Sequence, residues 1–497
     1  MKKSIFGMLL MMESLFLAFT TLVALYYHYT LGETDWEIFA VTTALTFLSG
    51  AALTIYGHTR LGRSRQTLSR GGSFIIVALT WIIFSLFGML PFIFYEGLRM
   101  DFASAMFETM SGFTTMGASV ISDIDAQPHG ILMWRSVMQW MGGLGIVVFS
   151  FALIPASDMK NANMAQAEMT GLSLDRLRPK IGATARRLLL IYVLFTVVCT
   201  ILYYVGPMNL FDALCHSFTT ISTGGFSTHK ASIGYFHSPY IEYVASLFMM
   251  LSGINFSLYY YISIMRGRLV RQNEELRAYL VMFFGLVLIF SLIFLYHPMV
   301  DSYVAEPQGL EEIFRTSLFH VSTIFTSTGY QAELFDYVGW GHAFWVPTAV
   351  MMIIGGCAGS TAGGMKMVRV LLYLKHLSRE FHLYLHPRAI QGIRMNGHVV
   401  PENTVQRTMS YLVVYALVII FGGSLFMVFF GYDFDSSISA CITSFSNIGP
   451  GMGDFGPASS FAGVPALGKL YLSFYMLVGR LEIFTVLFLF MPKAWKI

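Results

Sequence analysis

The sequence predicts an all-α polytopic membrane protein in which four related units follow two N-terminal transmembrane helices. Three observations indicate this fold class. The chain of 497 residues is 55% hydrophobic and only 12% charged, which leaves too little polar surface to cover a soluble domain. Its apolar residues gather in runs whose length is close to that of a bilayer-spanning helix, about 20 residues. A short element that ends in glycine also occurs four times along the chain.

The first 72 residues predict two transmembrane helices, over residues 4–28 and 38–58. A cleaved signal peptide is the alternative for the first apolar run. The run is longer than the about 7 to 15 residues of a signal-peptide core, and no clear cleavage site follows it. The loop after the second helix is basic and contains no acid, so the positive-inside rule puts this loop and the N-terminus in the cytoplasm.

From residue 73 onward one pattern repeats: a long apolar helix, a short semi-polar helix that ends at the glycine element, and a second long apolar helix. The N-terminal pair covers residues 1–72, and the four predicted units cover residues 73–187, 188–277, 278–407 and 408–497. The predicted long helices are 74–95 and 131–155, 188–206 and 239–265, 278–297 and 344–373, and 409–431 and 466–491. Each has a length that can span the hydrocarbon core.

Charge alternates between the connecting loops. The connections between units are basic, with Lys160, Arg176, Arg178, Lys180, Arg186 and Arg187, then Arg266, Arg268, Arg271 and Arg277, then Lys375, Arg379, Arg388, Arg394 and Arg407. The connections within units are acidic, with Asp101, Asp123, Asp125, Glu306, Glu311, Glu312, Asp433 and Asp435. This alternation predicts ten spanning helices, both termini in the cytoplasm and all four glycine elements entering from outside.

The repeated element reads Phe113-Thr-Thr-Met-Gly117, Thr220-Ile-Ser-Thr-Gly224, Phe325-Thr-Ser-Thr-Gly329 and Phe445-Ser-Asn-Ile-Gly449. The short helix before each copy is too polar and too short to span. Acidic N-caps are expected at Asp101, at Asp212, at Glu311-Glu312 and at Asp435. We interpret these segments as re-entrant pore helices, because non-helical backbone at membrane depth persists only where it is buried in protein or lines water. Close helix packing through Gly and Thr is the simpler alternative for any single copy.

Four such copies suit a cation pathway with pseudo-fourfold symmetry. Backbone carbonyl oxygens can replace the hydration shell of a cation without a buried fixed charge, and glycine permits the backbone angles that turn successive carbonyls toward one axis. The C-terminal ends of the short helices would add negative potential at the same place. The predicted filter residues are Thr114, Thr115, Met116, Gly117, Ile221, Ser222, Thr223, Gly224, Thr326, Ser327, Thr328, Gly329, Ser446, Asn447, Ile448 and Gly449.

The small polar side chain two positions before each glycine (Thr115, Ser222, Ser327, Asn447) has two open roles, either backing the filter through hydrogen bonds or satisfying local backbone.

Two departures from the repeat point to control of the pathway. The second helix of unit three contains five glycines in ten residues and should break into a loop within the membrane, with Gly355, Gly356, Gly359, Gly363, Gly364 and the following Lys366 as candidate gating residues. For the glycines, the alternative is tight packing of an unbroken helix. For Lys366, the alternative is that its long side chain only extends to the cytoplasmic surface of the membrane. Arg480, within the last span, is expected in a pore or in a structural ion pair.

These residues resemble the TrkH/TrkG/KtrB superfamily of potassium transporters, with Gln139-Trp-Met-Gly-Gly-Leu-Gly145, Gly253-Ile-Asn-Phe256, Gly355 to Lys366 and Gly479-Arg-Leu-Glu482 as the most specific pieces. The two extra N-terminal helices resemble the TrkH/TrkG branch. The resemblance implies four units of the form M1-P-M2 (helix, pore helix, helix), potassium at the four glycines and a gate at the Gly355 to Gly364 loop with Arg480 nearby. It also implies a homodimer in the bacterial inner membrane and a cytosolic nucleotide-binding regulatory partner of the TrkA type.

Potassium uptake is therefore the leading functional prediction, with potassium as the transported ion and no cofactor. In this superfamily, serine in place of the first glycine is associated with sodium permeation, and Gly117 is present here. A sodium-permeable or weakly selective relative stays the alternative, since no copy reads TVGYG. An enzyme is not expected, because the chain has no HExxH, paired intramembrane carboxylates or nucleophile motif. A net charge of +3 gives no reason to expect nucleic acid.

Overall fold

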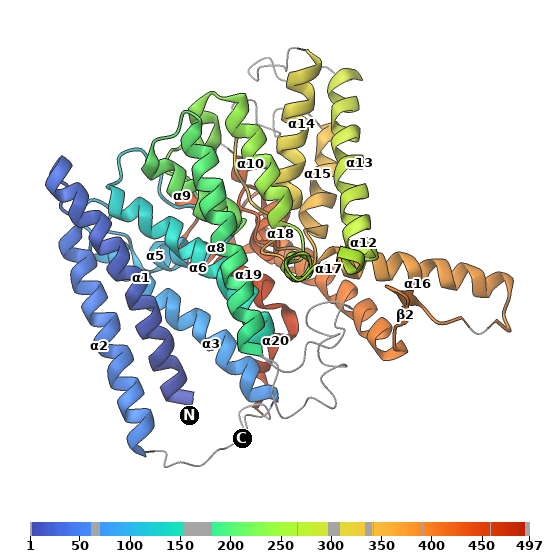
Figure 1. Ribbon diagram of the computed structural model, residues 1–497, viewed down its shortest axis with the longest axis horizontal. Coiled ribbons are helices and arrows are strands. Elements are labelled where there is room, and N and C mark those ends of the chain that lie inside the picture. Colours follow the sequence, from blue (N-terminus) through green and yellow to red (C-terminus); the bar gives the residue numbers. More distant parts are fainter. Residues whose placement is uncertain are drawn as a thin grey trace.

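The computed structural model describes residues 2–60, 70–152, 181–265, 267–296, 309–332, 340, 342–389, 391–457 and 459–492. Helices account for nearly all of its regular structure (Figure 1). The predicted basic residues Lys160, Arg176, Arg178, Lys180 and Arg266 and the acidic Glu306 lie outside the described residues.

Two long helices, α1 (Lys2–Leu31) and α2 (Trp36–Arg60), pack side by side as an N-terminal pair. The four units follow. Their first helices are α3 (Arg70–Gly88), α8 (Ile181–Val205), α13 (Glu274–Tyr296) and α17 (Glu402–Phe430). Their short central helices are α5 (Phe102–Phe113), α9 (Leu210–Ile221), α14 (Leu310–Phe325) and α18 (Phe434–Ser446).

The last helix of the first unit is α6 (His129–Ala152), and in the other units this helix is interrupted. The pairs are α10 (Pro239–Ser252) with α11 (Phe256–Ser263), α15 (His342–Ile354) with α16 (Met367–Leu385), and α19 (Ala466–Leu481) with α20 (Ile483–Leu487). The first of these pairs is bent by 88° and the last, continued to Phe490, by 117°. Short elements complete the fold: α4 (Leu90–Phe94), α12 (Gly267–Arg271), and the 3-10 turns Ser232–Phe236, Gly453–Phe455, Phe461–Gly463 and Phe488–Phe490.

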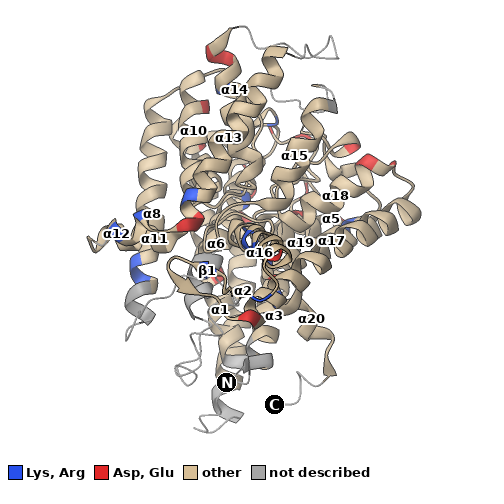
Figure 2. Cartoon of the chain, turned by 90° about the vertical axis from the view of Figure 1, so that its right-hand side faces the viewer, with Lys and Arg blue, Asp and Glu red and all other residues tan. Residues whose placement is uncertain are grey.

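Large apolar side chains remain exposed along the long outer helices, as expected for surfaces that face lipid. Figure 2 shows these helices almost free of charged residues along their middle. Within the described residues, six helices are long and apolar enough to cross a membrane, and eight if each strongly bent pair counts as one span. The other two of the ten predicted spans correspond to α6 and to the interrupted pair α15 and α16. The predicted fold class, an all-α multi-pass membrane protein with four units after an N-terminal pair, is confirmed.

The short central helices begin differently from the prediction in three units. Asp101 caps α5 as expected, accepting from the backbone N–H groups of Ala103 and Ser104. Helix α9 is capped by Asn209 and α18 by Asp433, so Asp212 and Asp435 lie in the first turn instead. Helix α14 begins after Gly309, whose φ of 98° starts the helix without a side-chain cap, and Glu311 and Glu312 occupy its first turn. The acidic residues therefore still lie where they favour the positive helix N-terminus.

A two-stranded hairpin, β1 (Arg394–Met395) and β2 (His398–Val399), was not predicted. It pairs Arg394 with Val399 and Met395 with His398. The two residues between the strands, Asn396 and Gly397, both have positive φ, at 50° and 80°. An Asn-Gly dipeptide with this geometry is the usual turn of a tight hairpin, so the signal was present in the sequence.

Candidate functional site

The four glycine elements form four turns with the same backbone geometry. In each turn a residue with positive φ is followed two positions later by a glycine with positive φ. The first residues are Thr115 (56°), Thr223 (53°), Ser327 (54°) and Asn447 (53°), and the glycines are Gly117 (84°), Gly225 (80°), Gly329 (83°) and Gly449 (107°). The conformational freedom of glycine is thus used at all four copies.

This geometry corrects the predicted register of the second copy by one residue. Gly225, and not Gly224, has the positive φ that matches Gly117. The position four residues before the glycine is then Ile221 in place of Thr220, so this position is apolar in every copy, with Phe113, Ile221, Phe325 and Phe445. That regularity is a signal that the sequence contains.

The four turns close into a ring, in which each glycine lies against the carbonyl oxygen before the next glycine. A Cβ added to Gly117 would lie 2.1 Å from the Gly224 oxygen, and one on Gly225 would lie 1.9 Å from the Thr328 oxygen. The corresponding distances are 2.0 Å from Gly329 to the Ile448 oxygen and 2.8 Å from Gly449 to the Met116 oxygen. No residue larger than glycine fits without a shift. We call the four oxygens, of Met116, Gly224, Thr328 and Ile448, the carbonyl ring.

The short helices end beside this ring. Helices α5, α9 and α14 each end four residues before their ring glycine, and α18 ends three residues before Gly449. Their partially negative C-terminal ends thus add to the negative potential of the carbonyl groups. All four ring glycines line one cavity, together with Arg135, Phe226, His229 and Lys230 among others. The site offers a cation backbone oxygens and helix ends at one place.

The small polar side chains named from the sequence differ in what they bond. Ser222 donates to the nearby Thr219 carbonyl, which is local backbone. Ser327 accepts from the Gly363 N–H, and Asn447 donates to the Met476 carbonyl at 3.2 Å, so these two tie their turns to other elements. The buried Thr115 hydroxyl has no partner within the described part of the chain.

The predicted interruption in unit three lies directly against these turns. The chain leaves the helix after Ile354 and resumes it at Met367. Between them, the Gly364 N–H donates to the Ser446 carbonyl at 3.0 Å, and the Thr361 hydroxyl donates to the Ile221 carbonyl at 3.1 Å. We call residues 355–366 the intramembrane loop. It contacts backbone at the start of the second and fourth turns.

Further contacts hold the intramembrane loop at its other side. The Cys357 N–H donates to the Gly253 carbonyl at 2.9 Å, and the Phe256 N–H donates to the Gly359 carbonyl at 3.1 Å, so the loop docks on the break between α10 and α11. The Ala358 N–H donates to the buried Glu275 carboxylate at 2.7 Å.

Arg480 and Lys366 both contact this loop. The Arg480 guanidinium donates to the Thr361 carbonyl at 2.8 Å and lies 3.5 Å from the Gly142 carbonyl. No acid pairs with Arg480 among the described residues, so the ion pair considered from sequence is not found there; Glu482 pairs with Arg369 at 2.7 Å instead. The Lys366 ammonium donates to the Ala362 carbonyl of its own loop. Both cations therefore lie at the loop.

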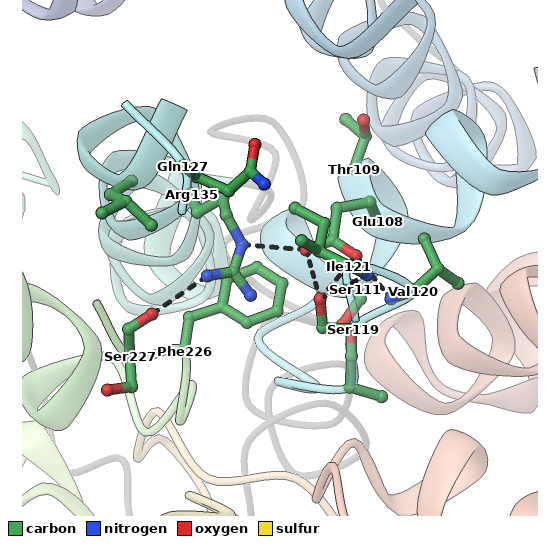
Figure 3. A network of polar contacts seen from close by, with 12 residues as sticks. Glu108, Thr109, Ser111, Ser119, Val120, Ile121, Gln127, Arg135, Phe226 and Ser227 are labelled. Carbon is green, nitrogen blue, oxygen red and sulfur yellow. Dashed lines mark hydrogen bonds and ion pairs between the residues drawn. The ribbon is translucent and has the colours of Figure 1, made fainter. Parts of the chain in front are cut away.

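Sequence reasoning missed three polar residues that reach the turns: Glu108 on α5, and Arg135 and Gln139 on α6. Arg135 and Glu108 form a buried ion pair at 2.9 Å (Figure 3). Gln139 is the first residue of the Gln139 to Gly145 motif, and no role was predicted for it. A charged residue on an otherwise apolar predicted spanning helix was the available signal for Arg135, the same signal that singled out Arg480.

The comparisons with known proteins agree with this architecture. A family model described as TrkH, cation transport protein, matches residues 37–497. The Trk system potassium uptake protein TrkH of Salmonella typhimurium is 36% identical over 99% of this chain and 98% of its own length, and TrkG of Escherichia coli K12 is 33% identical over 99% and 97%. The crystal structure of the potassium transporter TrkH from Vibrio parahaemolyticus matches with a TM-score of 0.86 at 32% identity, covering 99% of both chains. This chain therefore belongs to the TrkH family of cation transport proteins.

Proposed function

We propose that this protein takes potassium ions across the bacterial inner membrane through the carbonyl ring, with Gly117, Gly225, Gly329 and Gly449 as the filter glycines. The observation that carries the proposal is the closed ring itself, in which four turns of the same geometry bring four backbone oxygens together and their glycines line one cavity. A dehydrated cation needs such oxygens, and the ring supplies them without a fixed charge that would bind the ion too tightly to release it. Relatives named as potassium uptake proteins support potassium as the ion.

In this proposal the intramembrane loop is the gate. It lies against the second and fourth turns, and Arg480 holds it through the Thr361 carbonyl. A loop that blocks ions must be moved aside before ions can pass. The family resemblance suggests that a cytosolic nucleotide-binding partner of the TrkA type moves it. We propose in addition that the protein is a homodimer, that both termini are cytoplasmic, and that the units are divided near residues 73, 188, 278 and 408.

Cation flux into liposomes that contain the purified protein tests the proposal. Potassium, rubidium and sodium are compared in separate assays, with protein-free liposomes as the control. Flux that favours potassium and rubidium is expected. Equal sodium flux would favour the sodium-permeable alternative. Absence of flux in the protein with residues 358–360 deleted, in which the gate should be open, would contradict a pathway through the ring.

A further inference from the structure

A side chain outside the four turns holds one oxygen of the carbonyl ring. The amide Nε2 of Gln139 donates to the Gly224 carbonyl at 2.7 Å, and its Oε1 accepts from the Phe226 N–H at 3.0 Å. One amide group therefore grips the second turn on both sides of Gly225. Within the described ranges, Gly224 is the one ring carbonyl that accepts a side-chain hydrogen bond.

Arg135 lies one helical turn before Gln139 on α6 and reaches the same segment. Its Nη1 donates to the Ser227 carbonyl at 3.0 Å, and its guanidinium lies 4.1 Å from the centre of the Phe226 ring. Its Nε donates to Glu108, and the two side chains are only 1% and 0% exposed. Separating so deeply buried an ion pair would leave an uncompensated charge, which costs free energy, so the two side chains stay in place.

Glu108 extends this network to the first turn. Its carboxylate accepts from the Val120 N–H at 2.9 Å and from the Ser119 hydroxyl at 3.0 Å (Figure 3). Ser119 and Val120 follow Gly117 almost directly in the chain. An unbroken set of hydrogen bonds therefore runs from the segment after Gly117, through Glu108 and Arg135, to the segment after Gly225.

The fourth unit does not repeat this arrangement. Gly142 on α6 and Gly479 on α19 occupy equivalent places, because a Cβ on either would collide with the carbonyl four residues before the ring glycine of its unit, at 1.9 Å and 1.8 Å. Gln139 lies three residues before Gly142, whereas the residue three before Gly479 is Met476, whose side chain has no hydrogen to donate. The four oxygens of the carbonyl ring are therefore restrained unequally, because a side chain bonds the Gly224 oxygen.

We propose that Gln139, Arg135 and Glu108 are positioning residues for ion selectivity, which we call the α6 brace. The brace fixes the first and second turns relative to each other and restrains one of the four ring oxygens. This inference rests on the proposed potassium pathway. Discrimination between potassium and sodium depends on how many carbonyl dipoles meet the ion and at what distance, so loosening two adjacent turns lets the ring close around the smaller ion.

The test replaces each member of the brace and measures the ratio of potassium to sodium flux in liposomes. Gln139→Leu removes both hydrogen bonds at similar volume. Because only the bond to the Gly224 carbonyl restrains a ring oxygen, we expect the ratio to fall by about twofold to tenfold, the range that one lost hydrogen bond corresponds to. Arg135→Met should have a similar effect. Arg135→Lys should be intermediate, because lysine keeps the charge beside Glu108 but not the planar fork that also reaches Ser227.

Arg315→Gln is the matched control. It breaks the ion pair between Arg315 of α14 and Glu242 of α10, and Arg315 makes no hydrogen bond to a ring turn among the described residues. We expect this variant to lose thermal stability and to keep the wild-type flux ratio. Melting temperatures of all variants separate stability from selectivity, and Arg135→Lys gives a second measurement if Arg135→Met fails to fold.

Two results would overturn the brace. One is a wild-type flux ratio in Gln139→Leu and in Arg135→Lys. The other is an equal loss of ratio in Arg315→Gln, which would make the ratio a general measure of stability. A wild-type protein without potassium preference is a different failure, because it removes the proposed pathway before any variant is compared.

Discussion

At the scale of single residues, the adjacent Gly224 and Gly225 should respond very differently to substitution by alanine. Gly225 has a φ of 80°, and a Cβ there would lie 1.9 Å from the backbone oxygen of Thr328. Gly224 has no positive φ, and its added Cβ would meet the Gln139 side chain, which can rotate away. We expect Gly225→Ala to abolish potassium-selective flux, since strain of about 1 kcal/mol or more adds to a backbone collision. Ion flux in liposomes measures this effect.

Gly224→Ala is the control for that prediction. It should reduce the potassium to sodium ratio by no more than the Gln139→Leu change, because both substitutions displace the same amide. A larger loss in Gly224→Ala than in Gly225→Ala would restore the register first predicted from the sequence.

His229 gives a residue-scale prediction for pH. Its ring lies between Asp125, at 3.0 Å, and Asp212, at 3.3 Å, and it stacks on Tyr235 in the loop that follows the second turn. Burial lowers the pKa of His229, but the hydrogen bonds and charges of Asp212 and Asp125 outweigh this and raise it above its usual value. The stabilisation is therefore complete below the unfolded-state pKa of about 6.5 and is lost as pH rises through the raised folded-state value.

The melting temperature should report this titration. Burial also acts on Asp212, but hydrogen bonds from His229 and Thr228 hold the pKa of Asp212 below its usual value, so that carboxylate stays charged from pH 6 to 9. We expect the wild-type protein to melt about 1 to 3 °C above His229→Gln at pH 6, and this difference to shrink at pH 9. A difference that stays constant across this pH range would contradict the account.

At the scale of elements, the intramembrane loop predicts a gain of flux. Deleting residues 358–360 removes the contacts of the loop with Glu275 and Phe256 and draws Thr361 away from the Ile221 carbonyl. We expect potassium flux of the purified protein to rise about tenfold, the change that loss of about 1.4 kcal/mol of closed-state contacts produces. Liposome flux measures it.

The selectivity of the same variant is its internal control. The deleted residues bond to the break between α10 and α11 and to helix α13, and none of them makes a hydrogen bond to a ring turn in the described structure. The potassium to sodium ratio should therefore stay at the wild-type value while the rate rises. Higher flux with a lost ratio would indicate a damaged filter, and unchanged flux would show that the loop does not obstruct the path.

Elements were predictable where local chemistry decides them. The long apolar runs specified the outer helices, and the density of glycine specified the interruption after Ile354. The first residue of α9 could not be predicted, because Asn209 and Asp212 are both residue types that cap helices well, and in the structure Asn209 is the cap. The brace depends on α6 lying against a turn 85 residues away in the chain, from Gln139 to Gly224, which no local pattern contains.

At the scale of the whole molecule, the ring requires all four units at once. Each glycine abuts the next unit's carbonyl, and the fourth abuts the first, so no unit can form its part of the site alone. The sequence predicted this symmetry from repetition but placed the second copy one residue early. The apolar residue four positions before the glycine, Ile221, was the available signal for Gly225, and the backbone angles agree with it. Unequal support, such as the α6 brace, is visible only once the ring is assembled.

Membrane orientation is the whole-molecule prediction. Lys230 lies in the loop after the second turn, near Asp125, and Arg388 follows α16 in the basic connection of unit three; both are exposed. The positive-inside rule puts Lys230 outside and Arg388 inside. A membrane-impermeant maleimide should therefore label Lys230→Cys in intact spheroplasts, and Arg388→Cys only after lysis.

The wild-type protein supplies the background for this measurement. Its four cysteines, Cys199, Cys215, Cys357 and Cys441, are free and buried, so little labelling is expected before residues are replaced. Labelling of Arg388→Cys alone in intact spheroplasts would invert the whole chain and put the carbonyl ring's cavity on the cytoplasmic side. Labelling of both from outside would place an even number of crossings between them, contrary to the predicted three, which are the pair α10 and α11, helix α13, and the pair α15 and α16.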